Sequence, residues 1–182
     1  MQATRLRLPE VVLLQPRVFS DHRGSFFESF NARAFREAIG IDVDFVQDNH
    51  SISKPHVIRG LHYQIQQPQG KLVRVVAGAV FDVVVDLRRS SATFGQWVGV
   101  PLSAEDRTML WVPPGFAHGF YVTSDRDVEF LYKTTDYWAP EHDRTLLWND
   151  PAVGVEWRLT GTPLLTGKDE AGSPLAKCDV YE

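Results

Sequence analysis

The stretch 71-KLVRVVAGAVFDVVVDL-87 carries the clearest structural signal in the chain. In Lys71–Val76 and in Val80–Leu87, apolar side chains recur at every second position, which is the period of a β-strand. Ala77-Gly78 lies between the two runs and predicts the turn of a hairpin. In the second strand Asp82 and Asp86 fall on one face, opposite a row of apolar residues, so the two carboxylates share a surface.

Short strands continue outward from this stretch, and one helix precedes it. Asn31 can cap a helix over Ala32–Ile39, which Gly40 can end. Many short strands separated by turn residues are typical of a jelly roll. We therefore predict a mainly β fold: a jelly-roll barrel of two antiparallel sheets, with a short helix near the N-terminus and a loop-rich C-terminal segment after Trp148 that wraps back over the barrel. The other strands are expected at Gly95–Val100, Met109–Val112, Gly119–Val122 and Val128–Thr135.

Length and charge limit the kinds of protein that this chain can be. The 182 residues suit a single domain over residues 1–182. With 19 basic and 23 acidic residues the net charge is -4, which argues against a nucleic-acid partner. Cys178, the only cysteine, excludes an internal disulfide and fits a reducing compartment. We find neither a secretory h-region nor an apolar run of about 20 residues, so we expect a cytoplasmic protein without membrane contact.

Pro113–His118 has the form P-x-G-x-x-H, which resembles the second motif of the cupin superfamily. In metal-binding cupins the first motif supplies a His-x-His pair and a glutamate. Here Gln64 replaces the second histidine and Lys71 stands at the glutamate spacing, so only His62 and His118 remain. A zinc or iron site needs about three to four ligands, and a protonated lysine repels a cation. We expect a cupin-type barrel whose metal site has been converted, with no metal and no cofactor.

The residue types that remain suit proton abstraction beside a carbonyl group. His62 can act as a base, because the unperturbed pKa of histidine, about 6.5, lies near working pH. Tyr132 can donate its phenolic proton, and the Lys71 ammonium can stabilise an enolate oxygen as a metal would. Taken singly, however, such residues are more often packed or solvated than catalytic. Composition and periodicity alone predict no more than a β-barrel domain with a polar pocket.

Seven segments, in order from about Arg5 to Asp169, together resemble the dTDP-4-dehydrorhamnose 3,5-epimerase family. The resemblance implies an isomerase that epimerises C3 and C5 of dTDP-4-dehydro-6-deoxy-D-glucose, giving dTDP-4-dehydro-L-rhamnose in dTDP-L-rhamnose biosynthesis for cell-surface polysaccharide. The segments are Asp21–Glu28, Phe45–Ser51, Arg59–Gln64, Gln69–Val75, Gly115–Phe120, Phe130–Thr135 and Trp148–Pro151.

The resemblance also implies catalytic roles at matching positions. His62 would be the base that removes the C3 and C5 protons, and Tyr132 the acid on the opposite face of the sugar. Lys71 would stabilise the enolate oxygen at C4. Asp169 would pair with His62 and raise its basicity. Asp82 is a rival partner for His62, and the preference for Asp169 comes from the resemblance.

Eleven further residues match positions at which the family holds the nucleotide and sugar. Trp138 would stack on the thymine, and Asp143 stands where the family usually has glutamate, which puts that contact in doubt. The family is dimeric and exchanges its N-terminal strand, so Arg23 and Glu28 would reach the nucleotide of a partner chain. The eleven residues are Arg23, Phe26, Glu28, Gln47, Asp48, Asn49, Arg59, His118, Trp138, Asp143 and Lys168.

One conflict with strand geometry and three alternative functions stay open. Strict alternation places Arg59 and His62 on opposite faces, which a bulge at Gly60 could relieve. The nearest alternative function is epimerisation at C3 or C5 only. The others are a metal-dependent cupin dioxygenase or isomerase and a non-catalytic sugar-binding cupin. The sequence does not decide between dTDP- and UDP-sugars, the order of the two epimerisations, or which glycoconjugate receives the sugar.

Overall fold

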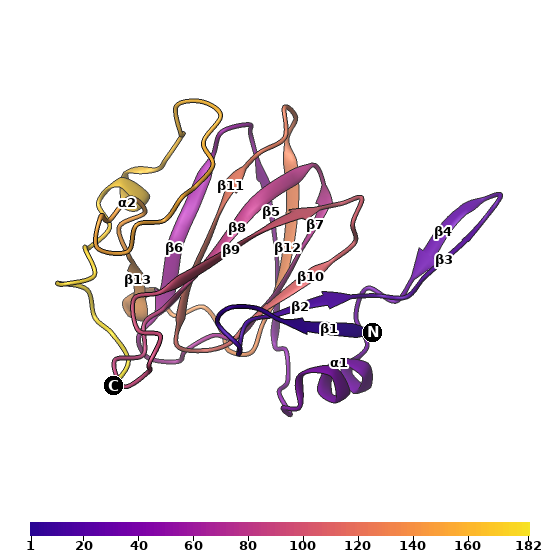
Figure 1. Ribbon diagram of the computed structural model, residues 1–182, viewed down its shortest axis with the longest axis horizontal. Coiled ribbons are helices and arrows are strands. Elements are labelled where there is room, and N and C mark those ends of the chain that lie inside the picture. Colours follow the sequence, from indigo (N-terminus) through magenta and orange to yellow (C-terminus); the bar gives the residue numbers. More distant parts are fainter.

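The Lys71–Leu87 stretch forms two strands that belong to different sheets. The computed structural model describes residues 1–182. In it, β7 (Lys71–Ala77) lies in a six-stranded sheet and β8 (Ala79–Asp86) in a five-stranded one (Figure 1). Gly78, with a φ of 78°, carries the chain from one sheet to the other. The predicted hairpin is therefore wrong, because each strand buries its inner face against the opposite sheet rather than pairing with the other.

Both sheets are antiparallel, as predicted, and together they form the jelly-roll barrel. The six-stranded sheet has the order β1-β2-β10-β7-β12-β5 and the five-stranded sheet the order β13-β6-β11-β8-β9. The bounds are β1 Gln2–Arg5, β2 Val12–Gln15, β5 Gln47–Ser53, β6 Ile58–Gln64, β9 Trp97–Ser103, β10 Met109–Val112, β11 Phe116–Val122, β12 Val128–Thr134 and β13 Asp143–Thr145.

The two faces of β8 are buried in two different cores. Val80 and Val84 point into the barrel, where they join a cluster with side chains of the six-stranded sheet such as Val73. Phe81 and Val83 point outward and pack in a second cluster with Val153 and Trp157. The segment after Trp148 thus wraps back over the five-stranded sheet, as predicted. Its short elements are α2 (Gly167–Glu170) and isolated bridges such as Val57↔Leu164 and Leu146↔Ser173.

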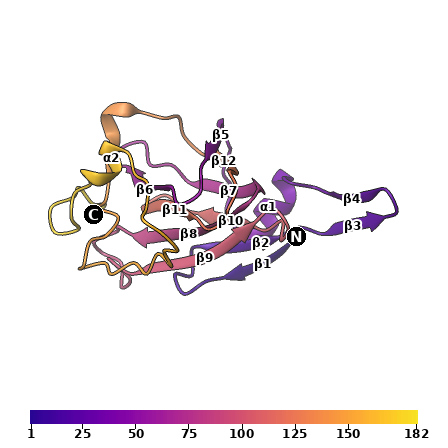
Figure 2. The same ribbon diagram turned by 90° about the horizontal axis from the view of Figure 1, so that it is seen from above.

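The predicted helix forms α1 (Ala32–Ile39) with the predicted ends. The Asn31 side chain accepts a hydrogen bond from the Ala34 amide, and Gly40 has a φ of 81°. Before α1, β3 (Val18–Asp21) and β4 (Gly24–Phe27) form a hairpin that projects away from both sheets, at the opposite end from α2 (Figures 1 and 2). A 3-10 turn (Pro140–His142) precedes β13. None of the helices has the length and apolar composition to span a membrane.

Candidate active site

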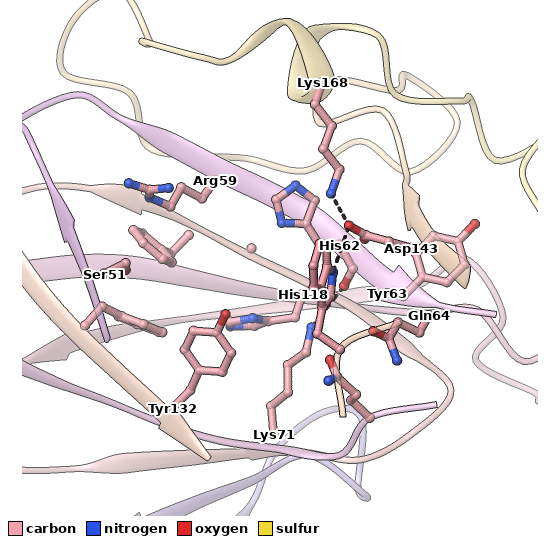
Figure 3. Close-up of a pocket in the computed structure, with 15 residues that line it drawn as sticks. Ser51, Arg59, His62, Tyr63, Gln64, Lys71, His118, Tyr132, Asp143 and Lys168 are labelled. Carbon is pink, nitrogen blue, oxygen red and sulfur yellow. Dashed lines mark hydrogen bonds and ion pairs between the residues drawn. The ribbon is translucent and has the colours of Figure 1, made fainter. Parts of the chain in front are cut away.

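A cavity of about 330 Å³ lies between the two sheets. Its wall is formed by β5, β7 and β12 of one sheet, by β6, β11 and β13 of the other, and by α2 (Figure 3). All but one of the predicted catalytic side chains line it, and the remaining one, Asp169, lies behind His62. The predicted residues in its wall are Arg59, His62, Lys71, His118, Tyr132, Trp138, Asp143 and Lys168.

His62 is paired with Asp169, as the sequence analysis expected. Nε2 of His62 lies 2.6 Å from Oδ1 of Asp169, whose side chain is 2% exposed. Oδ1 also accepts the Gly60 amide at 3.3 Å, and Oδ2 accepts the Thr166 hydroxyl at 2.7 Å. Because a carboxylate only accepts, the His62 proton sits on Nε2. Nδ1 has no partner within the chain and is available as a base.

The surroundings of His62 keep its ring neutral. Burial lowers the pKa of His62, and the positive charges of Lys168 and Lys71 add to this effect, while Asp169 opposes it. Burial also acts to raise the pKa of Asp169, but hydrogen bonds from His62 and Thr166 outweigh it and lower that pKa. The pair therefore holds a neutral imidazole beside a carboxylate anion, the arrangement that a general base requires.

Tyr132 lies across the cavity from His62, and the Lys71 ammonium lies in the wall beside the His62 main chain (Figure 3). Burial raises the pKa of Tyr132, against the effect of Arg59, so the phenol keeps its proton near neutral pH. The Lys71 ammonium donates to the main-chain oxygen of His62 at 3.3 Å. Burial lowers the pKa of Lys71 to about 8, while Asp143 and Asp82 oppose the shift. At pH 7 a buried ammonium and a protonated phenol thus line the same cavity as the neutral imidazole of His62.

Arg59 reaches the same cavity because of a bulge at the expected place. His62 pairs with His118 but Arg59 with Phe120, so β6 has one residue more than β11 in this interval. Gly60 fits here because a Cβ would lie 2.5 Å from Gly119 Cα. The bulge expected at Gly60 is therefore confirmed, and it allows Arg59 and His62 to face the same cavity.

Asp82, the alternative partner considered for His62, is hydrogen-bonded to His118 instead. Nε2 of His118 lies 2.9 Å and 3.0 Å from the two oxygens of Asp82, which is fully buried. Asp82 therefore holds His118 and not His62. No three side chains among the histidines, cysteines, aspartates and glutamates are grouped so that they could hold a metal ion.

The rim of the cavity carries Lys168, Asp143 and Trp138. The Lys168 ammonium forms an ion pair with Asp143 Oδ2, and the Trp138 indole N–H lies 3.5 Å from the same oxygen. The Trp138 amide donates to Gln47 Oε1 at 3.1 Å. Although aspartate is one methylene shorter than glutamate, Asp143 thus reaches the cavity. Gln47 and Asn49 line an adjoining hollow together with Tyr132 and Trp138.

Besides Gln47 and Asn49, four predicted binding residues do not line this cavity within one chain. Arg23 pairs with Asp21 at 2.6 Å on the projecting hairpin, and Phe26 is 70% exposed. Glu28 follows that hairpin. Asp48 bonds Lys133 at 2.8 Å beside a second hollow. The cavity also contains residues to which the sequence analysis gave no role, namely Ser51, Tyr63, Gln64, Gln69, Gly119, Phe120 and Phe130.

Known proteins resemble the chain over almost its full length. The family model for dTDP-4-dehydrorhamnose 3,5-epimerase matches residues 5–177. The dTDP-4-dehydrorhamnose 3,5-epimerase of Pseudomonas aeruginosa is 61% identical, over 100% of this chain and 99% of the relative. The structure of dTDP-6-deoxy-D-glucose-3,5-epimerase RmlC from Legionella pneumophila, in complex with dTDP-4-keto-L-rhamnose, has a TM-score of 0.95 at 48% identity, covering 98% and 94% of the two chains. ChmJ, a 3'-monoepimerase from Streptomyces bikiniensis in complex with dTDP-quinovose, has a TM-score of 0.88 at 34% identity, covering 97% and 88%.

Proposed function

The chain belongs to the dTDP-4-dehydrorhamnose 3,5-epimerase family, and from this premise we propose how its residues carry out the reaction. It is an isomerase that epimerises C3 and C5 of dTDP-4-dehydro-6-deoxy-D-glucose to give dTDP-4-dehydro-L-rhamnose, a step of dTDP-L-rhamnose biosynthesis. One observation carries the assignment of residues: the base His62 and the acid Tyr132 face a single cavity from opposite sheets, with the Lys71 ammonium in its wall.

In this proposal Nδ1 of His62 removes the proton from C3 or C5, each of which is next to the C4 ketone. The electron pair moves onto the ketone oxygen and forms an enolate, which the Lys71 ammonium stabilises. Tyr132 then returns a proton to the carbon from the opposite face and inverts it. Asp169 keeps the His62 proton on Nε2 throughout and stabilises the imidazolium that forms. His62 then loses its extra proton to solvent and Tyr132 regains one from solvent, so that a second cycle can invert the other carbon.

The remaining residues are proposed to hold the nucleotide. Arg59 and Lys168 supply positive charge for the diphosphate, Trp138 offers a stacking face for thymine, and Gln47 and Asn49 line the hollow beside it. His118 and Asp143 would contact the substrate from the cavity wall.

We propose a homodimer in which the N-terminal strands are exchanged. The β3–β4 hairpin supports this, because it exposes the apolar Phe26, carries Arg23 in its turn with Glu28 directly after it, and projects away from the sheet that contains β6, the strand of the chain's own His62. In a dimer those three residues, with Asp48, would complete the nucleotide site of the partner chain. We further propose that residues 1–182 work as one domain in the cytoplasm, without a metal, a cofactor, a nucleic-acid partner or a membrane.

Incubation with dTDP-4-keto-6-deoxyglucose in deuterated water, followed by NMR, tests the function. We expect deuterium at both C3 and C5 with inversion at both, whereas exchange at one carbon would support a monoepimerase. The variant Tyr132→Phe tests the acid. His62 can still remove a proton and return deuterium to the same face, so we expect exchange to continue while inversion falls at least about 10²-fold. Unchanged inversion in this variant would remove Tyr132 from the mechanism.

A further inference from the structure

Ser51 on β5 has a hydroxyl group with no partner. It lies in the wall of the cavity, its Oγ is shielded from water, and it forms no hydrogen bond within the chain. Only two other side-chain atoms share this state, Oε2 of Glu10 and Oγ1 of Thr145, and neither residue lines the cavity. A buried hydroxyl without a partner destabilises a fold, and such groups in native proteins call for an explanation. In a cavity wall, a ligand can supply the missing partner.

The neighbouring residues on the same strand face are already engaged. Side chains of β5 alternate, so Asn49, Ser51 and Ser53 share the inward face. The Ser53 hydroxyl accepts Nε of Arg59 at 2.8 Å, and the Ile52 carbonyl accepts Nη2 at 3.2 Å. These two bonds fasten the guanidinium of Arg59, which comes from β6 of the opposite sheet, onto β5. Nη1 of Arg59 keeps no partner within the chain.

Ser51 and Arg59 therefore carry unpaired donors on the same side of the cavity, and rotation of the Ser51 side chain about its Cα–Cβ bond would turn the shielded hydroxyl towards a ligand. Figure 3 shows both on the side that also carries Tyr132. The strand register supports this placement: Ser51 is opposite Phe130 on β12, and Tyr132 follows two positions later, opposite Asn49. Ser51 and Tyr132 are thus diagonal neighbours on paired strands and line the same stretch of the cavity wall. Because both groups donate hydrogen bonds, together they suit a ligand that offers oxygen atoms as acceptors.

We propose that Ser51 is a further substrate-binding residue, whose hydroxyl donates a hydrogen bond to an oxygen of the glycosyl diphosphate beside Arg59. The identity of that ligand rests on the proposed function, whereas the unpaired hydroxyl does not. The acceptor is a phosphoryl oxygen or an oxygen of the hexose. Phosphoryl oxygens are present in both dTDP and dTDP-L-rhamnose, whereas the hexose is present only in dTDP-L-rhamnose. Ser53 has a separate role as a positioning residue for Arg59.

Calorimetric titration of Ser51→Ala with dTDP and with dTDP-L-rhamnose tests the proposal. Loss of a hydrogen bond to a charged oxygen should weaken binding about tenfold or more. If the acceptor is a phosphoryl oxygen, both ligands bind more weakly. If it belongs to the sugar, only dTDP-L-rhamnose does. Ser51→Thr, which keeps a hydroxyl, should restore the affinity to within about threefold of the wild type.

Thermal unfolding of the ligand-free protein separates this role from a structural one. Because the hydroxyl has no partner in the fold, Ser51→Ala should leave the Tm unchanged or raise it. Thr145→Val is the matched control, since it removes the other unpaired hydroxyl, outside the cavity, and should change neither affinity. The proposal is overturned if Ser51→Ala binds both ligands as the wild type does, or if Thr145→Val loses as much affinity. Failure of the proposed function is a different result: the wild type would bind dTDP-L-rhamnose without turning over the keto sugar.

Discussion

Replacing Asp169 with asparagine tests both the negative charge beside His62 and the tautomer that this charge fixes. The substitution keeps the shape of the side chain but converts an acceptor-only carboxylate into an amide that can also donate. At the 2.6 Å contact with His62 Nε2, the amide can present its NH₂ group and so stabilise the tautomer with the proton on Nδ1. In that tautomer the nitrogen that faces the cavity can no longer accept a proton from the sugar.

The size of the effect follows from this change of tautomer. General-base catalysis contributes about 10²–10⁴-fold, and the corresponding Asp→Asn change in a serine protease triad costs about 10⁴-fold. We therefore expect kcat of Asp169→Asn to fall by about 10²–10⁴-fold. The residual rate should also respond differently to pH. In the proposed mechanism His62 acts in its neutral form, so activity should be lost as pH falls through its pKa. Asp169 raises that pKa against burial, and without it the acid limb moves to lower pH.

Steady-state kinetics from acid to neutral pH and dTDP titration measure both effects. Glu170→Gln is the matched control, because it removes one charge from an exposed position of the same short helix. It should keep the wild-type rate and acid limb. Asp169→Asn should bind dTDP within about threefold of the wild type, since the carboxylate lies behind His62. A variant with nearly normal kcat and an unmoved acid limb would refute the proposed role of Asp169.

Two further substitutions test the charges of Lys71 and Asp86. Lys71→Gln should lower kcat by about 10²–10³-fold, the usual effect of removing one oxyanion donor. It should also abolish the loss of activity that we expect in the wild type as pH rises through about 8, where the ammonium loses its proton, and pH–rate profiles of both proteins check this. Asp86→Asn should lower the free energy of unfolding by about 2 kcal/mol at pH 7. The reason is that the pKa of Asp86 is lowered from 3.8 to about 2, because hydrogen bonds from Arg88, Thr93 and Ser91 outweigh the effect of burial. Because the pKa of Asp86 is lower in the folded state, its contribution to the free energy of unfolding is present above about pH 4 and is lost as pH falls towards 2. Urea titrations of variant and wild type should therefore differ at pH 7 and converge near pH 2.

Local signals in the sequence predicted local structure well. α1 begins and ends where Asn31 and Gly40 indicate, because each cap acts within one turn of the helix. Strand pairing is not local. β7 and β8 each carry an apolar inner face, and these faces are covered when the strands lie in opposing sheets. The alternation within each strand is the same in a hairpin and in a barrel, so the period alone could not distinguish them.

The site shows the same division between local and distant information. Asp169 lies 107 positions from His62, so no spacing rule connects them and only the family resemblance pointed to the pair. Ser51 was within reach of a local argument, since it follows Asn49 by two positions in one strand and so shares its face. What the sequence could not reveal is that the Ser51 hydroxyl lacks a partner, because this depends on Arg59 being held by Ser53 instead.

The geometry also explains why His62, rather than His118, suits the role of base. Each histidine has a carboxylate partner, but the two carboxylates differ in their surroundings. Burial raises the pKa of Asp82, and the opposing effects of His118 and Lys71 do not reverse this. Asp169 gains bonds from the Gly60 amide and the Thr166 hydroxyl in addition to His62, and its pKa is lowered. An anionic partner raises the basicity of an imidazole, and of the two carboxylates Asp169 has the lower pKa and so the more stable anion, which favours His62 over His118 as the group that accepts a proton from carbon.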